Sequence, residues 1–380
     1  MNSLARFFTP LILAALLSCG APAKAEGWPV DPVGRLVAVG LPEKILFCGK
    51  EIPLGYEDVR ERLEFELLVI LGNPVQTSLW LKRMPRYFPD IERALKQEGL
   101  PDDLKYVAVA ESNLRADALS KAGASGPWQF MKATGSEKGL KQTRCMDERR
   151  DWDKATCAAT DFLEDLYGTF GDWPLALAAY NAGPGRVMDA RREQGESSYF
   201  ALKLPAETER YVFRIIAAKL VGENPERFGI DMSQAKLYAE LDTDEVELSV
   251  RKSISPKTVA SYAGISYRYL LILNPWMTGG DLPEGRYFIT IPAANKELFA
   301  KASAPSKQPP PPPAVKPAAP DQAVASAQTG AGTYDVQPGD SLSLIARKHS
   351  VKLGDLMSAN GLGKTSPLKP GQKLIIPVQN

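Results

Sequence analysis

The chain has 380 residues, 44% of them hydrophobic, and its 46 basic residues nearly balance 45 acidic ones. This length allows two or three domains with a sizeable core. A nearly neutral chain lacks the positive charge that attracts DNA or RNA, so we expect no nucleic-acid partner. One histidine and no paired Cys/His spacing argue against a zinc site, and we expect no metal and no cofactor.

Residues 1–25 are predicted to be an export signal. Leu11–Leu17 supply an apolar stretch that is too short to span a bilayer. Two processing sites compete: Ala23–Ala25 fits the small-x-small rule, whereas Cys19 ends a stretch that resembles a lipobox and would then carry lipid. We expect a periplasmic protein, anchored to the outer membrane if Cys19 is lipidated. A buried N-terminal helix is the alternative.

Export would bring the cysteines into an oxidising compartment. Cys145 and Cys157 lie close in sequence, so we expect a disulfide between them. Such a short closed loop would stabilise the fold by about 3 kcal/mol in the entropic model. Cys48 would remain a lone thiol, and three buried free thiols are the alternative.

Helical patterns dominate the first two thirds of the chain. Residues 26–88 are predicted to form an N-terminal helical extension, with apolar residues at helical spacing over 56–71. Residues 89–224 are predicted to form an all-α domain, because prolines stand at the helix starts and glycines at the ends. The individual helices are expected at 79–88, 89–99, from 101 onward, and at 153–167, 174–183 and 205–222.

The last third of the chain changes character. Residues 245–294 and 333–378 each follow a strand, helix, strand plan, and we interpret them as a diverged internal repeat. Residues 302–332 separate the two and are mostly Ala, Pro, Ser and Gln, including five consecutive prolines. This composition predicts an extended, semi-rigid linker.

One glutamate stands where the helical pattern predicts an apolar residue. Leu104, Val107 and Ala108 mark the buried face of the helix that begins near residue 101, and Glu111 falls at the same spacing. Burial and the negative end of the helix both disfavour a charged carboxylate, which should raise its pKa. A carboxyl group that stays protonated near neutral pH can act as a general acid, so Glu111 is the candidate catalytic residue.

Three further motifs follow Glu111-Ser112. They are Gly123-Ala124-Ser125-Gly126-Pro127-Trp128-Gln129, Ala179-Tyr180-Asn181-Ala182-Gly183 and Glu207-Thr208-Glu209-Arg210-Tyr211-Val212. The glycines of the first motif permit a tight backbone path, and the amide of Gln129 can bond hydroxyl or acetamido groups. Trp128 can belong to the core or offer a face on which a sugar stacks.

In this order and spacing, the motifs resemble the soluble-lytic-transglycosylase domain, family 23 of the glycoside hydrolases, over roughly residues 90–222. The resemblance implies a goose-lysozyme-like helical fold that cleaves the glycan strands of peptidoglycan. It also implies that Glu111 is the sole catalytic acid and that Tyr211 hydrogen-bonds it. The residues that it places around the sugars are Ser112, Gln129, Tyr180 and Asn181.

The C-terminal residues 333–378 resemble a LysM domain, a small βααβ unit that binds glycans containing N-acetylglucosamine. The resemblance implies Gly339, Asp340, Ser341 and Asn360 as glycan-binding candidates, although Asp340 and Ser341 can simply cap a helix. Residues 245–294 are similar but lack the Gly-Asp turn, so this LysM-like module is degenerate.

Taken whole, the chain resembles the D type of the membrane-bound lytic murein transglycosylases. The expected fold is a mainly α catalytic domain (goose-lysozyme-like) at residues 89–224, followed by two small α+β (βααβ) LysM-like modules. We expect a monomer whose partner is the peptidoglycan glycan strand.

A single placed carboxylate suits a substrate-assisted reaction, because ordinary glycosidases use two. We hypothesise that Glu111 protonates the oxygen between N-acetylmuramic acid and N-acetylglucosamine, and then takes the proton of the C6 hydroxyl as a 1,6-anhydro sugar forms. Two rivals stay open: a lysozyme-type peptidoglycan hydrolase and a non-catalytic peptidoglycan-binding protein. The sequence also leaves open whether cleavage occurs within strands or at their ends.

Overall fold

The computed structural model describes residues 32–304, 332–337, 340–363, 366 and 368–377. The chain divides into two units, Met1–Gly40 and Leu41–Asn380. The described part of the first unit contains α1 (Pro32–Val37). The predicted export signal, Cys19 and nearly all of the predicted linker lie outside the described residues. Across the described part, every helix falls short of the length or the apolar character that a membrane span needs.

The second unit begins with a short hairpin and two helices. Its elements are β1 (Leu46–Phe47), β2 (Lys50–Glu51), α2 (Glu57–Leu71) and α3 (Pro74–Glu98). The sequence pattern predicted a break at Pro89, but α3 runs on through Pro85 and Pro89 and ends at the left-handed Gly99. Proline removes one helical hydrogen bond. The buried face of α3 continues past both prolines, with Ile91 and Leu95 in the core, so packing outweighs this loss.

The helices that follow complete an all-α domain, as expected. Their bounds are η1 (Asp102–Leu104), α4 (Lys105–Ser112), α5 (Lys132–Glu137), η2 (Glu148–Arg150), α6 (Trp152–Phe170), α7 (Trp173–Ala182), α8 (Pro184–Gln194), η3 (Tyr199–Ala201), α9 (Ala206–Glu223) and η4 (Pro225–Phe228). The sequence pattern missed α8. Val187 is its one buried residue, so it shows no apolar periodicity.

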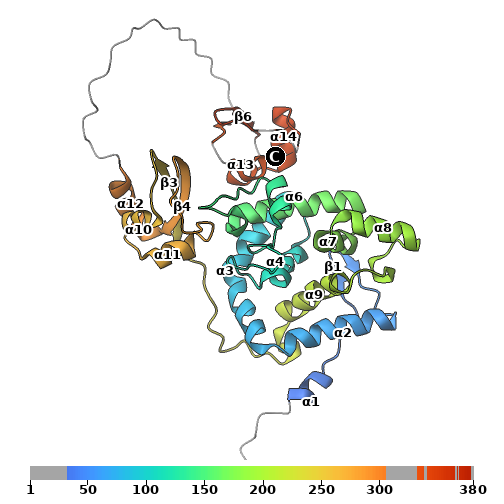
Figure 1. Ribbon diagram of the computed structural model, residues 1–380. Helices are drawn as coiled ribbons and strands as arrows, with labels where there is room; N and C mark the ends of the chain where they lie inside the picture. Colours follow the sequence, from blue (N-terminus) through green and yellow to red (C-terminus); the bar gives the residue numbers. More distant parts are fainter. Residues whose placement is uncertain (1–31, 305–331, 338–339, 364–365, 367, 378–380) are drawn as a thin grey trace, which may run out of the picture. The chain divides into compact units, whose positions relative to one another are not determined.

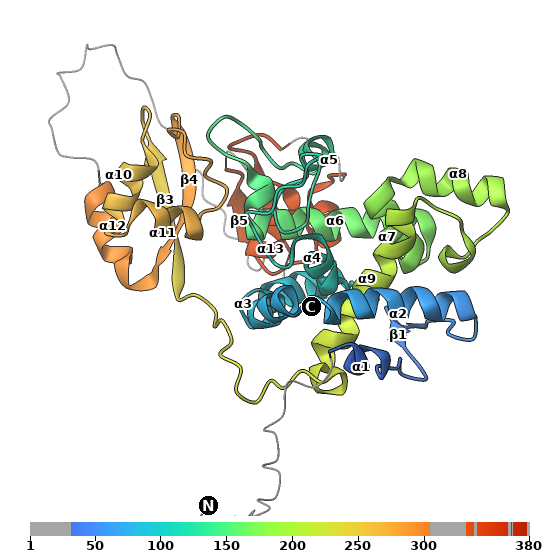
Figure 2. The same cartoon turned by 60° about the horizontal axis from the view of Figure 1, so that its bottom comes forward.

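Helix α9 is the centre of this domain. Most of its residues are buried, and it packs against α2, α4 and α7, an arrangement that Figure 1 and Figure 2 both show. Helix α2 of the predicted N-terminal extension is therefore part of the same core as the helices of the predicted catalytic domain. As a result, residues from α2, α4, α7 and α9 can meet although they are far apart in sequence.

Two βααβ modules follow the helical domain. The first consists of β3 (Thr243–Val250), α10 (Pro256–Tyr262), α11 (Tyr267–Leu273) and β4 (Gly285–Pro292), with η5 (Ala293–Asn295) and α12 (Lys296–Ser303) behind it. The second consists of β5 (Gly332–Asp335), α13 (Leu342–Lys348), α14 (Leu353–Asn360) and β6 (Lys373–Ile376). In each module the two strands pair antiparallel and enclose a small apolar core.

An asparagine at the end of the second helix supports the internal repeat. In the first module, the Asn274 amide donates to the carbonyl oxygens of Leu270 and Thr290 and accepts from the Thr290 N–H. In the second module, the Asn360 amide makes the same three bonds, to Leu356 and Ile375. Both modules thus fasten the second helix to the last strand in the same way.

Candidate active site

Glu111 is the second-last residue of α4, which ends at the left-handed Asn113. The side chain is partly exposed, and the preceding turns of the helix are buried in the core. The Tyr211 hydroxyl on α9 donates a short hydrogen bond to Oε1 of Glu111. The structure thus brings together the predicted acid and the predicted tyrosine, 100 residues apart in sequence.

Burial raises the pKa of Glu111 to about 7, while the hydrogen bond from Tyr211 and the positive charge of Arg214 lower it and the charge of Glu207 raises it. Desolvation disfavours the carboxylate, and a donor aimed at it favours the charged form. The two effects leave the group about half protonated at neutral pH. A carboxyl group in this state can both donate and accept a proton, which suits general acid–base chemistry.

Tyr180, on α7, lies close enough to Glu111 to feel its charge, and we call Glu111, Tyr180 and Tyr211 the Glu111 cluster. Its hydroxyl donates to the carbonyl oxygen of Trp128 at 2.7 Å. Burial raises the pKa of Tyr180 well above the usual tyrosine value, and the nearby charge of Glu111 adds to this effect. Because its proton is already engaged, the Tyr180 hydroxyl can offer only its oxygen, as an acceptor, to a ligand.

The loop at residues 123–131 is fixed by a buried ion pair behind it. The Arg149 guanidinium bonds Asp147 and donates to the carbonyl oxygens of Gly123 and Phe130. Gly126 has a φ of +86°, and a Cβ there would lie 1.7 Å from the Arg149 carbonyl oxygen. Only glycine fits at that position, so the close approach explains this part of the motif.

Trp128 belongs to the core. Its ring is 0% exposed, and its indole N–H donates to the Thr156 hydroxyl at 3.0 Å. Of the two roles considered for Trp128, sugar stacking is therefore the wrong one. Because the buried Trp128 holds this loop in place, it also fixes the backbone of the next residue, Gln129.

Ser112 is buried and connects α4 to this loop. Its hydroxyl lies 2.8 Å from the Pro127 carbonyl oxygen and 3.0 Å from the Ala108 carbonyl oxygen, and it accepts from the Arg115 N–H. These bonds use the single hydroxyl proton within the protein. The residue therefore holds the end of the catalytic helix and the loop in register.

In Gln129 and Asn181, one polar atom of the side-chain amide is hydrogen-bonded within the protein and the other remains for a ligand. The Gln129 Nε2 donates to the carbonyl oxygens of Ala118 and Gly126, which leaves Oε1 as an acceptor. In Asn181 the oxygen is the bonded atom: Oδ1 accepts from the Thr208 hydroxyl at 2.9 Å, and Nδ2 remains as a donor. Both side chains are partly exposed, so a sugar could use these atoms.

The sequence reasoning missed a buried charge network beside α9. Glu66, on α2, is 0% exposed and pairs with Arg210 and Arg214 of α9, and Arg214 also bonds Glu207. Glu66 follows Val59 and Leu63 at helical spacing. Glu66 is thus a carboxylate on an apolar helical face, the same pattern that predicted Glu111.

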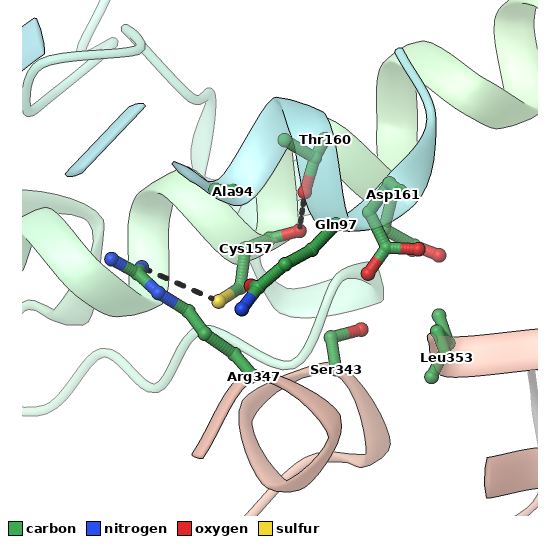
Figure 3. Close-up of a pocket in the computed structure, with 9 residues that line it drawn as sticks. Ala94, Gln97, Cys157, Thr160, Asp161, Ser343, Arg347 and Leu353 are labelled. Carbon is green, nitrogen blue, oxygen red and sulfur yellow. Dashed lines mark hydrogen bonds between the residues drawn. The ribbon is translucent and has the colours of Figure 1, made fainter. Parts of the chain in front are cut away.

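The predicted disulfide is wrong, because Cys145 and Cys157 are both free thiols. Cys145 lies in the loop before η2, with its sulfur 3.3 Å from the Thr143 hydroxyl. Cys157 lies on the buried face of α6, where the Thr160 hydroxyl donates to its carbonyl oxygen (Figure 3). The two cysteines belong to separately packed segments, so closeness in sequence did not join their sulfur atoms.

The described LysM candidates make hydrogen bonds within their own module. Asp340 accepts from the Gln337 N–H and the Tyr334 hydroxyl, and Ser341 caps α13 by accepting from the Leu344 N–H. The amide of Asn360 is used within its own module, as described above. Gly339 lies outside the described residues. Within the described part of the chain, no group of His, Cys, Asp and Glu could hold a metal ion.

Two family models match the chain. The transglycosylase SLT domain matches residues 89–202, and the LysM domain matches residues 334–377. The first match contains Glu111, Tyr180 and Asn181 but ends before Thr208 and Tyr211. The LysM match begins within β5 and covers the rest of the second βααβ module through β6.

One relative matches nearly the whole chain. The membrane-bound lytic murein transglycosylase D of Escherichia coli (strain K12) is 32% identical over 92% of this chain and 74% of its own length. The membrane-bound lytic murein transglycosylase F of Maricaulis maris is 32% identical over 29% of this chain and 25% of its own length.

One solved structure is similar to part of this chain. The 70 kDa soluble lytic transglycosylase of Escherichia coli has 21% sequence identity and a TM-score of 0.35 over 46% of this chain. The chain spans only 31% of that protein's length.

Proposed function

Because the chain belongs to the family of the membrane-bound lytic murein transglycosylase D, a family of peptidoglycan lytic transglycosylases, we propose that Glu111 is the residue that carries this reaction. One observation supports the assignment above the others. A carboxyl group with a raised pKa stands at the end of a buried helix and accepts a hydrogen bond from Tyr211. The substrate is the β-1,4 bond between N-acetylmuramic acid and N-acetylglucosamine.

In the first step, protonated Glu111 donates its proton to the bridging oxygen. The bond from this oxygen to C1 of the muramic acid breaks, and the N-acetylglucosamine leaves with a hydroxyl group. The acetamido oxygen of the muramic acid bonds to C1 and takes up the developing positive charge. The new carboxylate is stabilised by Tyr211, whose hydroxyl already donates to Oε1.

In the second step, the Glu111 carboxylate accepts the proton of the muramic acid's C6 hydroxyl. That oxygen attacks C1, the bond from the acetamido oxygen to C1 breaks, and a 1,6-anhydro ring forms. The carboxyl group is protonated again, so the enzyme returns to its starting state without consuming water. A pKa of about 7 serves both steps, because neither protonation state is strongly disfavoured.

The acetamido group would be held by the two neighbouring residues of α7. Asn181 offers the N–H donors of Nδ2, which suit the acetamido oxygen, and this oxygen keeps a second lone pair for C1. The Tyr180 oxygen, whose own proton is engaged, suits the acetamido N–H. Gln129 would accept from a sugar hydroxyl, and Ser112 would act by holding the loop rather than the sugar.

The test replaces Glu111 by Gln and measures the release of anhydromuropeptides from purified sacculi. We expect a loss of activity of at least a thousandfold, because the amide can neither donate the proton nor take one back. Glu92→Gln is the matched control, since Glu92 pairs with Lys105 in the same domain and lies outside the Glu111 cluster. A Glu111→Gln protein that still releases anhydromuropeptides would overturn the proposal.

We further propose that the LysM module holds the glycan near the catalytic domain. The family match over residues 334–377 supports this role, and a tethered weak contact raises the local concentration of substrate. Deleting residues 302–380 should leave cleavage of soluble fragments intact and weaken retention on sacculi. Unchanged sacculus binding in a pull-down would reject the tether.

We also propose that the protein works in the periplasm at the outer membrane. The membrane-bound designation of its relative supports a location in the cell envelope. Mass spectrometry of the mature N-terminus tests the anchor. A lipidated Cys19 would support it, whereas a chain that begins after Ala25 would contradict it.

A further inference from the structure

Asn181 owes its orientation to one residue that the reaction above does not use. The Thr208 hydroxyl, on the first turn of α9, donates to the Asn181 Oδ1 at 2.9 Å. Thr208 is 2% exposed, so its side chain has little contact with water. The structure turns the Asn181 Oδ1, and not the Nδ2, towards this hydroxyl, which therefore donates its one proton to the amide oxygen.

The bond decides which atoms Asn181 shows to a ligand. With Oδ1 turned towards α9, the Nδ2 group points away from the Thr208 hydroxyl and remains as a donor. An Asn side chain that rotated freely about its last bond would present donor and acceptor about equally. By holding Oδ1, Thr208 therefore makes Asn181 a hydrogen-bond donor towards a ligand.

This donor belongs to the same cluster as the acid. Thr208 precedes Tyr211 by three residues on α9, so both side chains lie on one face of the helix. Tyr211 bonds Glu111, and Asn181 follows Tyr180, whose pKa is raised in part by the charge of Glu111. The first two turns of α9 thus hold the acid through Tyr211 and the amide through Thr208.

We propose that Thr208 is a positioning residue that fixes Asn181 as a hydrogen-bond donor to an oxygen of the sugar at the scissile bond. The inference rests on the proposed function, because it assigns Asn181 to the substrate of that reaction. The acceptor is an acetamido oxygen or another oxygen without a proton, not a hydroxyl that must donate. Thr208 itself does not touch the sugar.

The test is a double-mutant cycle on the full chain with a soluble peptidoglycan glycan fragment. Thr208→Val keeps the shape of the side chain and removes the hydroxyl, and we expect kcat/KM to fall about tenfold, as for one lost hydrogen bond. Thr208→Ser keeps the hydroxyl and should stay within about twofold of the wild type. In an Asn181→Ala background, Thr208→Val should change kcat/KM by less than about twofold.

Two outcomes would overturn the inference. Thr208→Val could lower kcat/KM as much with Asn181→Ala as without it, which would mean that Thr208 supports the fold alone. Alternatively, Thr208→Val could match the wild type while Glu111→Gln is inactive, which would leave the proposed function standing without this inference. If Thr208→Val does not fold, Thr208→Ala and Thr208→Ser are compared in the same cycle. An active Glu111→Gln protein would instead contradict the proposed function itself.

Discussion

Replacing Tyr211 by Phe removes one hydroxyl group and leaves the ring in place. In the structure, this hydroxyl donates to Oε1 of Glu111, and it is the largest of the influences that lower the pKa of that carboxyl group. Burial, which raises the pKa, would then act with less opposition. We therefore expect the pKa of Glu111 to rise above its wild-type value of about 7 in the Tyr211→Phe protein.

The size of the rise follows from the strength of the bond. A hydrogen bond to a charged group contributes about 1.5–3 kcal/mol, and one pKa unit corresponds to about 1.4 kcal/mol. The pKa of Glu111 should therefore rise by about one to two units. Cleavage begins with the protonated acid, so kcat/KM falls as the pH rises through the pKa, and this alkaline limb should move upward by the same amount.

The assay measures kcat/KM on a soluble glycan fragment between about pH 5 and pH 10, with the acid limb recorded as a reference. Tyr199→Phe is the matched control, since Tyr199 is also a buried tyrosine but donates to the backbone carbonyl oxygens of Thr208 and Glu209. It should lose stability and keep the alkaline limb in place. An alkaline limb that does not move in Tyr211→Phe, or that moves downward, would refute the reasoning.

Three further predictions concern stability. The folded-state pKa of Glu111 lies above its usual value of 4.5, so the folded protein holds this proton more tightly, and the resulting stability, complete below about pH 4.5, is lost as the pH rises through about 7. The free energy of unfolding of Glu111→Gln, measured in urea, should therefore rise relative to that of the wild type by up to about 3 kcal/mol from pH 4 to pH 8. The same difference between the two proteins at both pH values would contradict this. Gly126→Ala should lower the free energy of unfolding by about 3 kcal/mol or more, because its Cβ would meet the Arg149 carbonyl oxygen, whereas Gly123→Ala, with nothing within 4 Å of its Cβ, should lose only about 1–2 kcal/mol from its positive φ; equal losses would count against the close approach. Asn274→Ala removes three hydrogen bonds and should speed hydrogen–deuterium exchange in β4 at least tenfold, and unchanged exchange would mean that the asparagine does not fasten the strand.

The sequence predicted the acid because the residues on the buried face of a helix recur at a regular spacing. Glu111 stands out as a carboxylate at an apolar position, in the last turn before its helix ends at Asn113. Glu66 fits the same pattern, yet it serves to hold two arginines of α9. Periodicity thus identifies buried carboxylates, and only the partners in space separate an acid poised for catalysis from an ion pair.

The roles of the smaller polar residues could not be read from the chain. Ser112 and Gln129 were expected at the sugars, which stays a prediction, but the sequence did not show that carbonyl oxygens of the 113–131 region accept from the Ser112 hydroxyl and the Gln129 Nε2. Which partner takes a hydroxyl or an amide depends on segments that meet only in the fold. For the same reason, the motif that contains Thr208 did not reveal its partner, since the bond from Thr208 to Asn181 spans 27 residues.

Helix boundaries failed where local rules and packing disagreed. Pro89 was expected to start a helix, yet the buried face of α3 carries the helix through it. Helix α8 has a single buried residue, Val187, and therefore no pattern to detect. The disulfide failed because closeness along the chain says nothing about whether Cys145 and Cys157 share a side of the fold.

The account depends on a reaction in which Glu111 moves both protons and the sugar closes on itself. Mass spectrometry of muropeptides released from sacculi in isotopically labelled water tests this directly. We predict 1,6-anhydro ends that contain no labelled oxygen, and no such products with Glu111→Gln. Reducing ends that carry the labelled oxygen would show that water, and not the C6 hydroxyl, attacks C1, and would contradict the account.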